Sequence, residues 1–220
     1  MARESIAGVV IPDTRLADAV TDRTREIYAS APFHHARRIF LLGTLLGRVR
    51  GVVADPELLY AAAMLHDWEP TAPCASSDGR LQLGAADQVL NFLLAFGRPV
   101  ADARRAWLAV ALHSTSGSRL CPVPEAAVLA AGVEADVVGR GLRDLEPDQA
   151  EAVLAAHPRT GYPEYRSGSR PGAGHECHCA SFEGDDMTEA DMTGLIEECL
   201  RFVPAWRTDT RPRSVLSGTG

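Results

Sequence analysis

The sequence has 220 residues, of which 46% are hydrophobic and 23% charged, as suits one globular domain with a sizeable core. Its net charge of −7 argues against a nucleic-acid partner, because binding to a phosphate backbone needs a concentrated basic surface. The chain contains no lysine, which excludes Schiff-base chemistry and the lysine of a phosphate-binding P-loop.

No stretch has the length and apolar character of a signal peptide or a membrane-spanning helix. A cytoplasmic location and the absence of a membrane partner are therefore expected. The five cysteines are expected to be free thiols, because their number is odd and the expected compartment is reducing.

Apolar residues recur at intervals of three and four through most of the sequence, which predicts helices. The first begins with a cap at Asp13 or Thr14, and Pro32 separates it from the second. Asp55 caps the third helix, and Gly97 is expected to end the fourth. The predicted helices cover approximately residues 14–28, 34–49, 56–66, 85–96, 99–113, 124–138, 146–157 and 187–203.

Two stretches lack this periodicity, and no strand pattern of useful length occurs, so the fold is predicted to be all-α. Residues 69–84 are rich in Pro, Ser and Gly and are predicted to form a long loop, a candidate lid. Residues 158–186 are predicted to be a loop or a partly disordered segment. Whether the metal-competent side chains there bind anything stays open, because they lack the two-pair spacing of a structural zinc site. They are His175, Cys177, His178 and Cys179.

The third predicted helix, LLYAAAMLHD, ends in adjacent His66 and Asp67. An imidazole and a carboxylate at the edge of a core are costly unless another group, such as a metal, satisfies them. In an arbitrary His-Asp pair, however, a helix-end histidine bonded to a neighbour is commoner than a ligand. His35 shares a helix face with apolar residues and is either a core histidine or a ligand, whereas Arg37 is expected to point away from that face.

Two further side chains are candidates. His113 ends the fifth predicted helix before the turn STSGS, where it either complements the helix dipole or faces a ligand. Asp136 lies near the end of the sixth, where a lone carboxylate is ordinarily a solvated charge or a cap.

Taken together, His35, His66-Asp67 and Asp136 have the order and helical placement of the H…HD…D signature of the HD-domain superfamily. The flanking stretches IPDT, HHARRIFLLG, DPELLYAAAMLHD, VALHSTSG and AAGVEADVVG resemble its cyanamide-hydratase-like branch. The likeness covers approximately residues 11–158, interpreted as an HD-type helical domain. Residues 159–220 are interpreted as an irregular Gly/Pro-rich segment plus a C-terminal helix packed on the same domain.

The resemblance implies a single-domain helical bundle with a metal site between its helices. His35, His66, Asp67 and Asp136 would hold one divalent ion, with Zn²⁺ the first expectation and Fe²⁺ or Mn²⁺ the others. The implied activity is that of a metal-dependent hydrolase or hydratase that acts on a small molecule through a metal-activated water. Asp67 or Asp136 would accept the proton of that water, and His113 would hold or protonate the substrate.

Two alternatives remain from the sequence. One is an HD-type phosphohydrolase acting on a nucleotide, with Arg37, Arg38 and Arg80 as candidate phosphate contacts. The other is a non-catalytic HD domain that binds a ligand, and a homodimer is considered for either function. His34 replaces the asparagine that usually precedes the first ligand, and residues 68–70 replace a typical leucine-glycine, so cyanamide itself is not predicted as the substrate.

Overall fold

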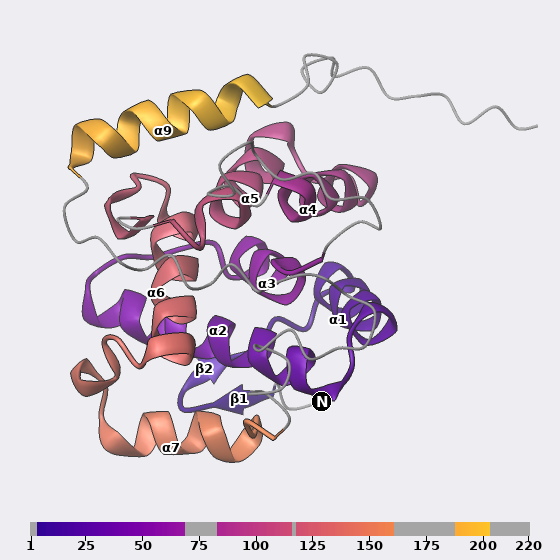
Figure 1. Cartoon of the computed structure of the whole chain (residues 1–220). Helices are drawn as coiled ribbons and strands as arrows, with labels where there is room; N and C mark the ends of the chain where they lie inside the picture. Colours follow the sequence, from indigo (N-terminus) through magenta and orange to yellow (C-terminus); the bar gives the residue numbers. More distant parts are fainter. Residues whose placement is uncertain (1–3, 69–82, 116–117, 161–187, 203–220) are drawn as a thin grey trace, which may run out of the picture.

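The computed structural model describes residues 4–68, 83–115, 118–160 and 188–202 (Figure 1). In these ranges the chain is a single all-α domain with one small β-hairpin. Its helices are α1 (Arg15–Ile27), α2 (Ser30–Val49), α3 (Pro56–Leu65), α4 (Leu83–Ala95), α5 (Val100–Leu112), α6 (Pro124–Val138), α7 (Pro147–Ala156) and α9 (Glu189–Phe202). The remaining elements are the strands β1 (Ser5–Ile6) and β2 (Val9–Val10) and the 3₁₀ turns η1 (Ser118–Leu120) and η2 (Leu142–Asp144).

Local capping signals set most helix ends. The Thr14 hydroxyl accepts a hydrogen bond from the Ala17 amide at 3.3 Å, and Asp55 caps α3 by accepting from two backbone amides. Gly139 ends α6 with φ at 75°, a conformation that glycine adopts without strain. These ends lie within a residue or two of the predicted ones.

The start of α2 differs from the prediction. The helix begins at Ser30 rather than at residue 34, with Pro32 inside its first turn. Proline is tolerated there because the first amides of a helix have no partner within the helix. Pro32 therefore does not end helical structure at this point.

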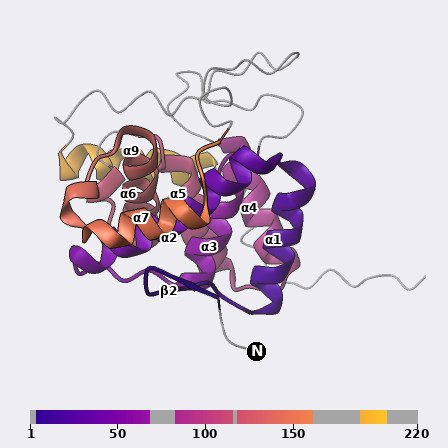
Figure 2. The ribbon, with the colours of Figure 1, turned by 90° about the horizontal axis from the view of Figure 1, so that it is seen from below.

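The β-hairpin was not predicted. Ser5 pairs with Val10 and Ile6 with Val9, and the connecting residues Ala7 and Gly8 both have positive φ, as in a two-residue turn. Strands of two residues are too short to show an alternating pattern. The hairpin packs against α2 and α7 (Figures 1 and 2).

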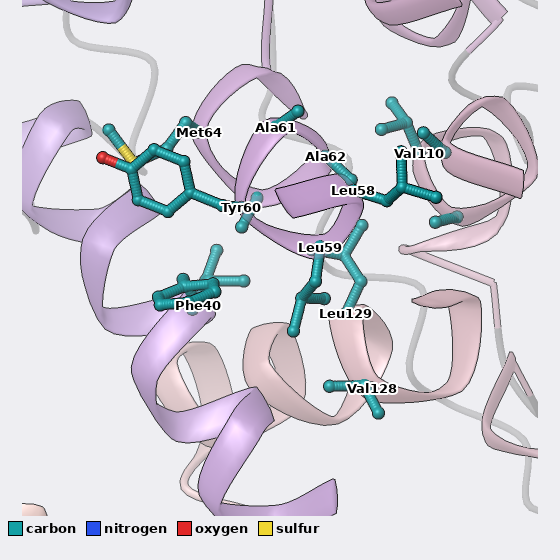
Figure 3. Close-up of a cluster of buried hydrophobic side chains, with 14 of the residues drawn as sticks. Phe40, Leu58, Leu59, Tyr60, Ala61, Ala62, Met64, Val110, Val128 and Leu129 are labelled. Atoms are coloured by element: carbon teal, nitrogen blue, oxygen red, sulfur yellow. The ribbon is translucent and has the colours of Figure 1, made fainter. Parts of the chain in front are cut away.

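Helix α3 lies at the centre of the bundle. All residues from Leu58 to Leu65 are buried, and the helix contacts α1, α2, α4, α5 and α6. Side chains from neighbouring helices, including Phe40, Val110 and Leu129, surround it (Figure 3). A helix that is apolar on every side must be enclosed in this way. The residues directly after it, His66 and Asp67, consequently emerge at the edge of the core.

Helices α2 and α6 pack closely in opposite directions. A Cβ on Gly132 would collide with the Ile39 carbonyl oxygen, and a Cβ on Gly43 would lie 2.6 Å from the Val128 carbonyl oxygen. Because the two helices run antiparallel, residues four apart along α2 face residues four apart, in reverse order, along α6. One further step brings the α2 residue His35 opposite Asp136 of α6.

Two other findings concern the whole described chain. None of the described helices combines the length and apolar character needed to cross a lipid bilayer. Cys121 is a buried free thiol, as predicted, and the other four cysteines fall on residues or side chains that are not described.

Candidate metal centre

The side chains of the candidate site lie in, or directly after, four helices. His35 comes from α2, His66 and Asp67 directly follow α3, His113 directly follows α5, and Asp136 lies in α6. The three histidines and Asp136 are buried, whereas 17% of the Asp67 side chain is exposed. The site is therefore closed on most sides, and Asp67 lies on its accessible side.

The three imidazole rings lie together. The centroid of the His66 ring is 5.3 Å from that of His35 and 5.0 Å from that of His113. One ligand-competent atom each of His35, His66 and Asp67 can be chosen so that all three lie within 4.8 Å of one another. Residues far apart in the sequence thus meet at one place.

The two helix-end histidines share one local arrangement. His66 Nδ1 lies 2.8 Å from the Ala63 carbonyl oxygen, and His113 Nδ1 lies 2.7 Å from that of Val110. Because a carbonyl oxygen only accepts, Nδ1 must carry the proton in both rings. Burial lowers the pKa of both histidines, that of His113 to about 4, so both are neutral at pH 7. In each ring Nε2 then carries an unprotonated lone pair.

His35 is oriented by Asp136. Its Nδ1 donates to Asp136 Oδ2 at 2.6 Å, and both side chains are buried. A neutral His35 therefore presents Nε2 as an acceptor or ligand. A histidine held at one nitrogen by a carboxylate is the usual partner of a metal at the other nitrogen.

His66 and Asp67 form a contact that favours a cation. Among the described residues His66 Nε2 has no hydrogen-bond partner, and Asp67 Oδ2 lies 3.3 Å away. With Nδ1 protonated, this contact brings a nitrogen lone pair close to a carboxylate oxygen, two groups that only accept. A positive ion beside both groups would stabilise this arrangement.

The spacing of the group is compatible with one ion. Ligands of an ion with bonds of about 2.1 Å lie about 3.4 Å apart in a tetrahedral site and at most about 4.2 Å apart when they are opposite each other. The chosen atoms of His35, His66 and Asp67 lie within 4.8 Å of one another. Binding of all three atoms to one divalent ion would draw them closer together.

Asp136 lies behind His35, outside that group of three. Arg38 donates to both of its oxygens, at 2.7 and 3.0 Å, and Arg159 lies 3.0 Å from Oδ1. Burial raises the pKa of Asp136, but the hydrogen bonds from His35 and Arg38 outweigh burial and lower it to about 2. Its place as a direct metal ligand stays a prediction, and the contact that is present orients His35.

Two of the three arginines that the sequence suggests as phosphate contacts, Arg37 and Arg38, are buried. Arg37 is buried against the rings of Phe33 and Tyr60 rather than exposed to solvent. Glu4 of the N-terminal segment lies 3.8 Å from its guanidinium. That Arg37 points away from the helix face of His35 stays a prediction. Arg38 is bound to Asp136. Arg80, most of the 69–84 loop and the His175–Cys179 cluster lie outside the described residues.

Sequence reasoning missed two features near the site. Arg38 follows His35 by three residues, so both reach Asp136 from the same side of α2, and that spacing was an available signal. His34, which directly precedes the predicted ligand His35, lies beside His157, with their Nδ1 atoms 3.1 Å apart. No local signal indicated that pair.

Comparison of the sequence with protein-family models gives no match, and comparison with curated proteins gives none either. The resemblance to the HD-domain superfamily therefore rests on the signature residues and their flanking stretches.

Proposed function

We propose that the chain is an HD-type metal-dependent hydrolase or hydratase of a small molecule. The observation that supports this most directly is the contact between His66 Nε2 and Asp67 Oδ2, because a cation beside both groups would stabilise two acceptors that lie 3.3 Å apart. His35 is held by Asp136 in the tautomer that a metal ligand needs.

The donor set suits a divalent transition metal. Imidazole nitrogens with a carboxylate oxygen are usual for Zn²⁺, and Fe²⁺ and Mn²⁺ accept similar sets. His35, His66 and Asp67 would hold the ion, with Asp136 in support. When bound, such an ion lowers the pKa of water to about 7, which provides a nucleophile at neutral pH.

In the proposed reaction, side chains of the protein transfer the proton and hold the substrate. Asp67, the more exposed carboxylate, is placed to accept a proton at whichever oxygen does not hold the ion. His113, with a pKa lowered to about 4, presents a neutral Nε2 beside His66 and would accept a hydrogen bond from the substrate. Of the two roles expected for His113, holding the substrate thus fits better than protonating it.

The test is elemental analysis of the purified protein together with the variant His66→Ala. We expect about one divalent ion per chain in the parent protein and loss of both metal and turnover in the variant. His157→Asn is a matched control, because His157 is also a buried histidine but lies outside the group. Undiminished activity in metal-free His66→Ala protein would refute the proposal.

The alternatives are outcomes of the same experiments. Phosphate release from a nucleotide panel would favour the phosphohydrolase, although Arg38 is bound to Asp136 and Arg37 to the N-terminal segment. Absence of metal from protein purified without chelator would favour a ligand-binding domain. The small-molecule substrate, a homodimer and the cytoplasmic location stay predictions.

A further inference from the structure

A second cavity lies between the other ends of α2 and α6. It has a volume of about 260 Å³, and its walls include Gly47 of α2 with Val128 and Ala131 of α6. Gly47 follows His35 by 12 residues, about 18 Å along the helix. The cavity is therefore separate from the candidate metal centre, and ligand binding in it does not depend on a metal.

Small residues of both helices line this space. At Gly47 the neighbouring backbone and side chains approach closely, since a Cβ there would lie 2.9 Å from the Val52 carbonyl oxygen and 3.0 Å from the Val128 side chain. Ala131 adds only a methyl group. The close packing of the two helices thus leaves an apolar hollow beside their contact, with the half-exposed Leu120 at its edge.

The polar side chains that line the cavity are both arginines. Arg50 and Arg119 contribute to the wall, and none of the described lining residues is acidic. Arg50 is exposed, and within the described part of the chain its side chain forms no hydrogen bond or ion pair. Its guanidinium packs against Gly141, where a Cβ would lie 3.2 Å from Nη2. Arg50 thus adds a positive charge to the wall of this cavity, in a chain of net charge −7.

The lining of the cavity, which is apolar with guanidinium groups and has no described acidic residue, indicates what kind of ligand would fit it. The hollow favours a hydrocarbon body, and guanidinium groups bind carboxylates through paired hydrogen bonds. At about 30 Å³ per heavy atom, the volume suits roughly eight or nine atoms. We propose that this cavity binds a small carboxylic acid with an apolar body, its carboxylate on Arg50 and its chain between α2 and α6.

The proposal is tested by NMR titration of the full chain with hexanoate. We expect saturable shifts at the backbone amides of Gly47 and Ala131. Hexanol, which lacks the charge, and inorganic phosphate, which lacks the apolar body, should each bind at least about tenfold more weakly. The affinity for hexanoate should also fall as ionic strength rises.

Variants separate the two parts of the site. Arg50→Gln should weaken hexanoate binding about tenfold, and Ala131→Leu, which fills the hollow, should abolish it. Arg15→Gln is a matched control, because Arg15 is also exposed at a helix end, and it should bind as the parent does. Arg50→Gln changes only an exposed side chain, so it remains informative if Ala131→Leu does not fold.

Several results would overturn the proposal. They are the absence of saturable binding, shifts that map away from the cavity, hexanol or phosphate binding as tight as hexanoate binding, and unchanged affinity in Arg50→Gln or in folded Ala131→Leu.

Discussion

The buried carboxylate of Asp136 is the most highly connected group near the candidate site. It accepts from His35 and Arg38 and lies 3.0 Å from Arg159, so it balances the charge of a fully buried guanidinium. Its role for stability is separable from any role in binding a metal, since the Arg38 contact needs no ion. The contacts explain why a carboxylate can stay ionised in the core.

Replacing Asp136 by Asn should therefore destabilise the fold. The change keeps the shape of the side chain but leaves Arg38 buried without its counter-charge, which costs about 3–5 kcal/mol. Urea unfolding measures the difference. Asp22→Asn, at an exposed position, should stay within about 0.5 kcal/mol of the parent. Equal stability of the two variants would contradict the assigned role of the Asp136 contacts.

His157 predicts a dependence of stability on pH. Burial, together with the charges of Arg37 and His34, lowers its pKa to about 4, whereas an unfolded histidine titrates near 6.5. The unfolded chain thus binds the proton first as the pH falls. Its contribution is complete above pH 6.5 and is lost progressively down to about pH 4, with a loss of about 2 kcal/mol between pH 7 and pH 5.

The variant His157→Asn isolates this contribution. Its unfolding free energy should fall less between pH 7 and pH 5 than that of the parent. Part of the pH dependence should remain, because His34, His66 and His113 also have lowered pKa values. An unchanged pH slope in His157→Asn would rule out the assignment.

At the scale of elements, the contact between α2 and α6 aligns the site. The glycines at the crossing let the backbones approach, and the reversed four-residue steps then bring His35 opposite Asp136. Helix α3 contributes differently, since it is enclosed on all sides and delivers His66 and Asp67 at its end. The geometry of the site thus depends on how the helices pack.

Gly132→Ala should separate the two helices and destabilise the protein by roughly 1–3 kcal/mol, because the new methyl group would meet the Ile39 carbonyl oxygen. Chemical denaturation measures the loss. Gly194→Ala in α9 is the matched control, since no atom lies within 4 Å of its Cβ position. There alanine should stabilise the helix by up to about 1 kcal/mol. Destabilisation of the same size in both variants would argue against a packing origin.

For the whole molecule, bound metal should act as a ligand of the folded state. The predicted ligands His35, His66 and Asp67 come from α2 and from the residues directly after α3, so the site is assembled only when the bundle is folded. An ion at 100 times its dissociation constant would stabilise the fold by about 2.7 kcal/mol. Chelator should therefore lower the melting temperature and Zn²⁺ restore it, with no such response in His66→Ala. A melting temperature that changes neither with chelator nor with Zn²⁺ would contradict this prediction.

Features that depend only on neighbours within a turn or two were predictable from the sequence. Thr14, Asp55 and Gly97 mark helix ends because a cap needs only adjacent amides or a permitted φ. The apolar run before His66 and Asp67 likewise predicts a buried helix that ends on two polar side chains. The all-α fold and most helix boundaries follow from such local signals.

Which side chains meet depends on how the helices pack in the tertiary structure. His35 and Asp136 are 101 residues apart, and their hydrogen bond exists because α2 and α6 pack in one register at Gly43 and Gly132. The burial of Arg37 beneath the N-terminal segment is likewise a contact between distant residues. Helical periodicity states which face of a helix is apolar but not which neighbour covers it, and packing alone supplies that neighbour.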